Sequence, residues 1–199
     1  AIRLGADNTT NDLKYRYLDP KDVMVVNIDD ETAGFSVITT DENSSETGDT
    51  ATFSVRLNSE PIDNVTLSMS SLDSEEGAVT DPSSKELTFQ PTNWLIYQTV
   101  TVTGADDNQT DGNQDFTIQL LGDSSTSDNR YRDLLPPSVT LTNIDNESAG
   151  FLVSSISGNT SENGTTATFT VSLTSQPTEN VTLTLFSDDS SEGEVSPEF

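Results

Sequence analysis

Acidic side chains recur at the turns of this sequence, and carboxylates gathered in one place are the usual ligands of hard divalent cations. Four stretches carry them: SSETGDT, LDSEEG, GADDNQTDGN and NIDNES. The candidate metal ligands are Glu46, Asp73, Asp106, Asp107, Asp111, Asp145 and Glu147. The sequence contains no Cys and no His, which excludes thiol catalysis, Ser-His-Asp chemistry, disulfides and zinc sites of the usual kind.

Calcium is the cation that such a set would take. Two carboxylates about 5 Å apart repel by roughly 3 kcal/mol at an effective dielectric near 20, so a converging set must bind protons or cations. Calcium accepts six to eight oxygens in flexible geometry, whereas magnesium demands a strict octahedron and keeps its waters. Seven carboxylates exceed the needs of one ion, which points to two or more ions per repeat.

A solvated acidic surface is the alternative interpretation, because a lone surface carboxylate is usually hydrated. The candidate ligands recur at turns, which favours calcium. Other acids keep the solvated interpretation, namely Asp41, Glu42, Asp49, Asp63 and Asp123. Catalysis is the third alternative, since Asp106 and Asp107 are paired carboxylates. Adjacent residues on a polar turn lack the separation across a cleft that glycoside hydrolysis needs, so we predict that the segment is not an enzyme.

The sequence repeats itself. NIDDETAGFSV begins at Asn27 and NIDNESAGFLV begins at Asn143, an offset of 143 − 27 = 116 residues. The same offset relates Tyr15 to Tyr131 without a gap. It also carries Ile2 to Ile118, Val23 to Val139, Glu46 to Glu162, Gly48 to Gly164 and Phe53 to Phe169. A register held over this span defines a tandem repeat.

The repeat gives a domain map. Residues 1–33 are the C-terminal part of a preceding repeat, 34–149 form a complete repeat, and 150–199 are the N-terminal part of a following repeat. Only the middle unit has the residues for a complete core, so the two partial repeats are expected to expose unpaired strand edges. The first residues read as the middle of a strand, and the chain looks cut from something longer.

Short runs with alternating apolar residues indicate strands in the complete repeat. Seven runs are found, around residues 35–37, 51–57, 65–69, 87–89, 100–102, 116–120 and 139–141. No stretch shows helical periodicity. Seven such strands in about 115 residues predict an all-β fold, an antiparallel two-sheet sandwich of the immunoglobulin type. Trp94 is expected to plug the core or a sheet edge.

The topology of such a sandwich decides which acids meet. Alternate turns lie at opposite ends, so the turn after the fifth strand and the end of the seventh strand share one tip. The turn after the third strand reaches the same tip. Glu46 reaches it only if the first strand breaks and crosses to the other sheet there. The seven candidate ligands are therefore expected to converge.

The motifs SETG at Glu46, VTGADDNQTDGNQDFTIQL from Val102 and VTLTNIDNESAGF from Val139 together resemble the Calx-beta family. The resemblance covers the middle repeat and both partial ones, and it is nearest to divergent bacterial Calx-beta-like surface repeats. It implies that carboxylates at the seven positions named above bind a calcium cluster at the domain tip. The sequence departs from the family pattern at Asn108, Gln114 and Asn146, where acids are common.

These features predict a calcium-binding repeat module of a large secreted or cell-surface adhesion protein, in which calcium stabilises the tip and stiffens the linker between repeats. The expected partners are calcium ions, neighbouring repeats and cell-surface or matrix ligands. A net charge of −26 disfavours nucleic acid and anionic membranes, and no apolar run suits membrane insertion. The alternative is an intracellular calcium-sensing regulatory domain of a membrane transporter.

Overall fold

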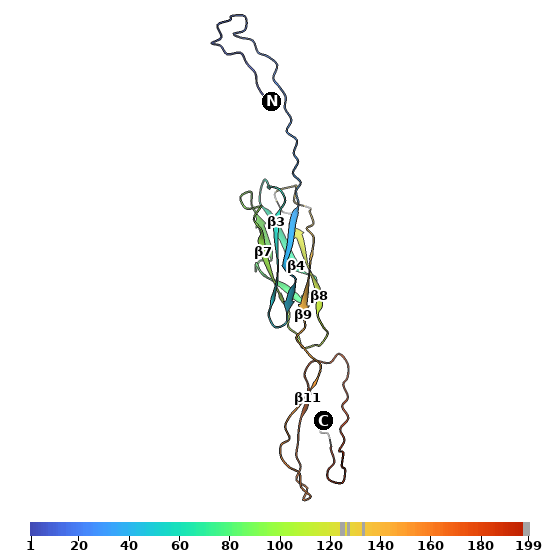
Figure 1. The fold of residues 1–199 in the computed structure, drawn as a ribbon. Helices are drawn as coiled ribbons and strands as arrows, with labels where there is room; N and C mark the ends of the chain where they lie inside the picture. The colour runs from blue at the N-terminus through green and yellow to red at the C-terminus, as the bar shows by residue number, and fades with distance from the viewer. Residues whose placement is uncertain (124–125, 127, 133, 197–199) are drawn as a thin grey trace. The chain divides into compact units, whose positions relative to one another are not determined.

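The chain folds into strands joined by turns. The computed structural model describes residues 1–123, 126, 128–132 and 134–196 and divides the chain into two compact units, Ala1–Thr32 and Ala33–Phe199 (Figure 1). Within these described ranges all the regular elements are β-strands, and none is a helix long and apolar enough to cross a membrane. The prediction of an all-β fold is confirmed.

The second unit contains a sandwich of two sheets (Figure 1). The first sheet is antiparallel and has the order β1 (Phe35–Asp41), β3 (Thr50–Leu57), β7 (Gln98–Gly104), β5 (Gly77–Asp81). The second has the order β2 (Asn43–Ser45), β9 (Val139–Ile144), β8 (Gln114–Gly122), β4 (Val65–Ser71), β6 (Glu86–Phe89). Its pairs are antiparallel except β2 with β9, which run parallel. The seven predicted strands all form, and β2 and β5 are additional.

Alternate residues of these strands fill the space between the sheets. Phe53, Val100 and Phe89 have little or no exposed surface, and they come from both sheets. Each apolar side chain fully buried in this way contributes about 1.5–3 kcal/mol relative to exposure. Trp94 is half-buried and packs against this core, as predicted. The two-sheet immunoglobulin-like sandwich is confirmed.

The chain changes sheets between β1 and β2. Its pairing with β3 shifts register between Thr39 and Asp41, and β2 then joins β9 in the other sheet. The following turn needs a glycine, because Gly48 has φ of 103° and its N–H donates to the Ser45 carbonyl at 3.0 Å. The predicted break of the first strand is therefore present, and it carries Glu46 to the end of β9.

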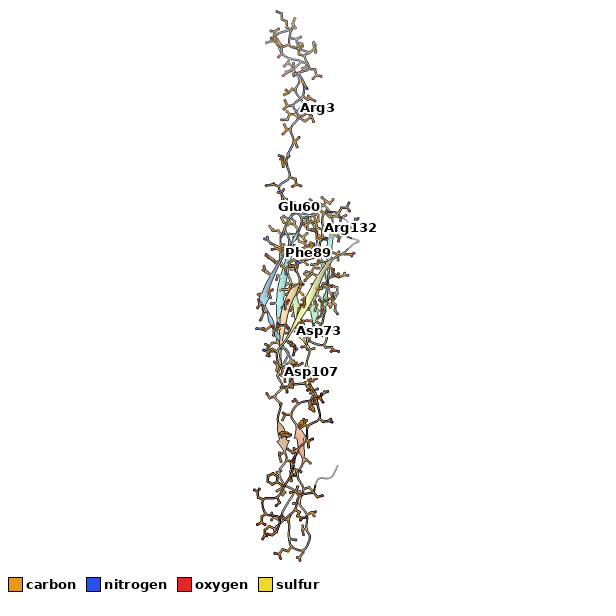
Figure 2. The ribbon with its side chains drawn as sticks, turned by 90° about the vertical axis from the view of Figure 1, so that its right-hand side faces the viewer. Arg3, Glu60, Asp73, Phe89, Asp107 and Arg132 are labelled. Atoms are coloured by element: carbon orange, nitrogen blue, oxygen red, sulfur yellow. The ribbon has the colours of Figure 1, made fainter. Side chains whose placement is uncertain are left out.

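The opposite end of the sandwich is fixed by a buried tyrosine, and Figure 2 shows Glu60 and Arg132 toward this end and Asp73 and Asp107 toward the other. The Tyr131 hydroxyl donates to the Ser59 carbonyl at 2.6 Å and accepts a hydrogen bond from the Ser59 N–H at 3.1 Å. These contacts satisfy polar groups that would otherwise be buried without partners. We call residues 59–62 the base loop.

Asp128 ties the base loop to the rest of this end. Its carboxylate accepts hydrogen bonds from the Ile62 N–H at 2.8 Å and the Arg130 guanidinium at 2.7 Å. The hydrogen bond from Arg130 is the largest cause that lowers the pKa of Asp128 from 3.8 to about 2, with the Ile62 N–H as a further cause. A depressed pKa means that the native state binds fewer protons than the unfolded state.

We therefore expect Asp128 to contribute stability that is complete above pH 4 and lost as the pH falls from about 4 through 2. Asp128→Asn should lower the free energy of unfolding at pH 7 and remove this part of the acid dependence. Urea denaturation of both proteins between pH 2 and 7 measures it. Asp63→Asn, at an exposed carboxylate, is the control. Parallel pH profiles for wild type and Asp128→Asn would contradict the prediction.

The partial repeats reproduce pairings of the complete one. In the second unit, β10 (Phe151–Val153) and β11 (Val171–Leu173) pair Phe151 with Leu173, as β1 and β3 pair Phe35 with Leu57. In the first unit Ile2 pairs with Val23, the counterparts of Ile118 and Val139 at the offset of 116. Many apolar side chains of both parts are exposed, as expected for incomplete cores. The repeat boundaries remain a prediction.

Candidate metal centre

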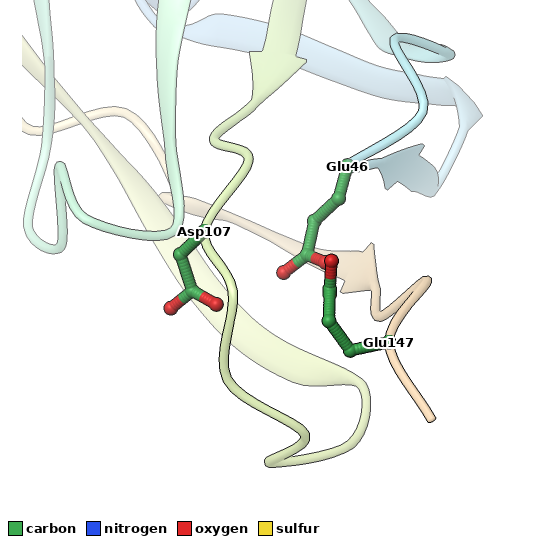
Figure 3. A group of neighbouring side chains, drawn as sticks. All are labelled: Glu46, Asp107 and Glu147. Atoms are coloured by element: carbon green, nitrogen blue, oxygen red, sulfur yellow. The ribbon is translucent and has the colours of Figure 1, made fainter. Parts of the chain in front are cut away.

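Three carboxylates from distant parts of the sequence meet at the tip of the sandwich. Glu46 follows β2, Asp107 follows β7 and Glu147 follows β9. One carboxylate oxygen of each lies within 4.8 Å of the other two, and all three residues are half-buried. Figure 3 shows the carboxylates of Glu46 and Glu147 pointing toward one another, with Asp107 on the neighbouring segment. We call these three residues the acidic cluster.

Hydrogen bonds made by Asp145, as acceptor, and Asn146, as donor, fix the segment that carries Glu147. The Asp145 carboxylate accepts from the N–H groups of Gly112 and Glu147, both at 2.7 Å. These two backbone bonds lower the pKa of Asp145. The Asn146 N–H donates to the Glu46 carboxylate at 3.2 Å, and its side-chain amide donates to the Asp106 carboxylate at 3.3 Å. The loops after β2, β7 and β9 are therefore held together.

A buried asparagine supports the cluster from the sandwich side. Asn143 is 2% exposed, its amide donates to the Ala105 carbonyl at 2.9 Å, and its side-chain oxygen accepts from the Ser44 hydroxyl at 3.3 Å. Only glycine leaves room for it at position 104, because a Cβ there would overlap the Asn143 side-chain oxygen. Asn143 thus links the starts of the loops that carry Glu46 and Asp107.

Glu76, Asp73 and Asp111 are three further acids beside the acidic cluster. The Ala105 N–H donates to the Glu76 carbonyl at 3.0 Å, which joins the start of β5 to the Asp106–Asp107 turn. Burial raises the pKa of the Glu76 carboxyl, the Asn143 amide lowers it, and the charges of Asp111, Asp73 and Asp107 raise it further. Asp73 and Asp111 are exposed, whereas Glu76 is half-buried.

The structure thus places all seven predicted residues at this tip. Glu46, Asp107 and Glu147 are mutually close, the Asp145 carboxylate accepts from the Glu147 N–H, and the Asp106 carboxylate accepts from the Asn146 amide. The charges of Asp73 and Asp111 raise the pKa of the neighbouring Glu76. The sequence analysis missed the supporting Asn143 and the half-buried Glu76. Recognition of β5 as a strand pairing with β7 would have placed Glu76 beside Ala105.

The closeness of Glu46 and Glu147 disfavours ionisation of both carboxyl groups. The hydrogen bond between the carboxyl groups of Glu147 and Glu46 is the largest cause that raises the pKa of Glu147 to about 7, followed by burial and by the charges of Glu46 and Asp145. The Glu147 Oε2 atom is buried and accepts no hydrogen bond from the described residues. A buried carboxylate oxygen without a donor is an open position for a positively charged ligand.

The family of the chain is now defined. The fold is a β-sandwich with an acidic tip, which is the class of a calcium-binding module. The family model of the Calx-beta domain matches residues 19–148, and the chain belongs to this family. Calx-beta domains bind calcium, which agrees with the cation predicted from the sequence.

The other comparisons are sparser. A solved structure titled as the apo form of a Calx CBD1 domain is 13% identical, with a TM-score of 0.38, and the match covers 57% of this chain and 99% of that one. A comparison with the curated proteins finds no match.

The residues present fit a calcium ion. The acidic cluster offers hard oxygens from three side chains, and the unpartnered Glu147 Oε2 gives one of them an unused lone pair. Calcium accepts such oxygens in flexible geometry, and its charge offsets the mutual repulsion of the three carboxylates. His and Cys ligands of softer metals are absent from the sequence.

Proposed function

We propose that the chain is a calcium-binding repeat segment of a large secreted or cell-surface protein, in which bound calcium stabilises the tip and stiffens the linker to the next repeat. The proposed ligands are the acidic cluster together with Asp106, Asp145, Asp73 and Asp111, and we include Glu76 because it is half-buried beside them. This number of carboxylates is sufficient for two or more ions.

The observation that carries the proposal is the position of Glu147. It belongs to the acidic cluster and lies two residues before Ala149–Gly150, which lead directly into β10 of the following repeat. An ion bound there restrains the last residues of one sandwich and so the residues that join it to the next. Arrays of similar units with restrained junctions behave as extended rods.

The composition supports an extracellular location and an adhesive role. The chain has 34 acidic and only 8 basic residues, and similar repeats follow one another. Extracellular calcium modules bind with dissociation constants of about 10⁻⁴–10⁻³ M, which is matched to calcium concentrations outside cells. In this setting the module is a non-catalytic spacer or binding module, and matrix or cell-surface ligands are the partners proposed for the parent protein.

Small-angle X-ray scattering of the chain tests the stiffening. We expect a larger radius of gyration in saturating calcium than in chelator, because restrained junctions sample fewer bent arrangements. Glu147→Gln should reduce this difference, while Glu194→Gln, at an exposed acid far from the cluster in sequence, should retain it. An identical radius in calcium and in chelator would rule out stiffening.

A further inference from the structure

The turn after Asp107 contacts the next repeat. Both partners lie in the second unit. The Gln176 N–H donates to the Asn108 carbonyl at 2.6 Å, and Gln109 and Gln176 form an isolated parallel bridge. The Thr110 hydroxyl donates to the Ser175 hydroxyl at 2.9 Å. We call Asn108–Thr110 the docking turn.

The docking turn is joined to the acidic cluster by one side chain. The Asp107 carboxylate accepts from the Gln109 N–H at 2.6 Å and from the Gln109 side-chain amide at 3.2 Å. The same carboxylate belongs to the acidic cluster. An ion that holds the Asp107 carboxylate in place therefore also restrains Gln109. The neighbours of Gln109 make the contact, Asn108 with Gln176 and Thr110 with Ser175.

The repeat offset identifies the corresponding surface on the complete repeat. Ser175 and Gln176 correspond to Ser59 and Glu60, since 175 − 116 = 59 and 176 − 116 = 60. These residues belong to the base loop, toward the end of the sandwich opposite Asp107 (Figure 2). One repeat thus carries the docking turn at its tip and the base loop at its other end.

The base loop of the complete repeat offers one backbone donor for the same contact, the Glu60 N–H, whereas Ser59 is buried with its hydroxyl hydrogen-bonded to Tyr131 at 2.8 Å. Arg130 donates to the Glu60 carbonyl at 3.0 Å, which fixes the backbone of this residue. Among the residues that the structure describes, none accepts a hydrogen bond from the Glu60 N–H, and Glu60 is exposed. This N–H corresponds to the Gln176 N–H that donates to Asn108, so it is a free donor at the matching position.

We infer that the docking turn of each repeat binds the base loop of the repeat that follows it, with the next copy of the same module as the partner. In this chain the contact joins Asn108–Thr110 to Ser175–Gln176, and the exposed Glu60 N–H receives the docking turn of a preceding repeat. The inference rests on the proposed function in one respect, which is that calcium orders the docking turn through Asp107.

Hydrogen exchange of the Gln176 amide tests the contact in the whole chain. We expect this amide to be protected in calcium. Thr110→Val removes the hydroxyl donor to Ser175 with almost no change of shape, and should lower the protection about fivefold, the effect of losing one hydrogen bond of typical net strength. Chelator should also lower the protection. Thr178→Val, which changes a neighbouring threonine outside the contact, should leave it unchanged.

Two outcomes would overturn the inference. The first is a Gln176 amide that exchanges at the rate of an unstructured peptide in calcium, and the second is equal protection in wild type and Thr110→Val. Calorimetric titration with calcium separates this result from the proposed function. Absence of calcium binding would refute the proposed function, whereas the protection of Gln176 and its sensitivity to Thr110→Val would still decide whether the docking turn binds the base loop.

Discussion

Gly104→Ala should destabilise the sandwich and weaken calcium binding together. The added Cβ would overlap the Asn143 side-chain oxygen and lie 3.0 Å from the Ser45 carbonyl oxygen. Asn143 must then move, so the Ala105 carbonyl loses its amide donor and the Ser44 hydroxyl keeps only the Thr142 carbonyl, at 3.4 Å. Overpacking together with unsatisfied buried polar groups should lower the free energy of unfolding by about 3–5 kcal/mol.

Urea denaturation in chelator measures the stability of this variant, and calorimetric titration measures its calcium affinity, which we expect to fall at least tenfold. Asn143 supports the loops of Glu46 and Asp107 at once, so a displaced amide disturbs two members of the acidic cluster. Gly158→Ala is the matched control, because a Cβ there meets no atom within 4 Å. A Gly104→Ala protein with wild-type stability would disprove the supporting role of Asn143.

The double substitution Asp106→Asn/Asp107→Asn should abolish the stabilisation by calcium. A ligand at 100 times its dissociation constant stabilises the native state by about 2.7 kcal/mol, which raises the melting midpoint of a domain of this size by roughly 10 °C. The variant should show little or no rise. In chelator its midpoint should equal or exceed that of wild type, because two mutually repelling charges are removed from the tip.

Thermal melting with and without calcium measures both effects, and calorimetry measures the heat of binding. Asp41→Asn/Glu42→Gln is the control, since both side chains are exposed and also adjacent in sequence. This control should keep the full rise in calcium. A double variant at Asp106 and Asp107 that melts like wild type in both conditions would show that these carboxylates do not bind the ion.

Much of the fold was predictable because one face of each strand is buried. Phe53, Val55 and Leu57 alternate with polar residues, and burial of alternate residues is what the sandwich core requires. The strand β2 was not predictable in this way. Its sequence is Asn-Ser-Ser, and Ser44 and Ser45 are buried through hydrogen bonds instead of apolar packing.

The candidate site was predictable to the extent that its carboxylates lie at turns. Each turn between predicted strands lies at a predictable end of the sandwich. This placed the turns that carry Asp107 and Glu147 at one tip. Glu76 was missed because its position depends on β5. Val79 is the one side chain of β5 in the core, so this strand has no alternating apolar pattern in the sequence. Asn143 was missed because an amide that supports a site has no composition or charge signal of its own.

The parallel pairing of β2 with β9 has a mechanical consequence. Both strands end at the tip, where Ser45 pairs with Ile144, and β9 leads directly out of the sandwich. Tension applied through the two ends of the repeat pulls these neighbouring strands lengthwise past each other. The hydrogen bonds of the ladder, among them those from Thr142 to Glu42 and from Glu46 to Ile144, then bear the load simultaneously instead of opening one after another.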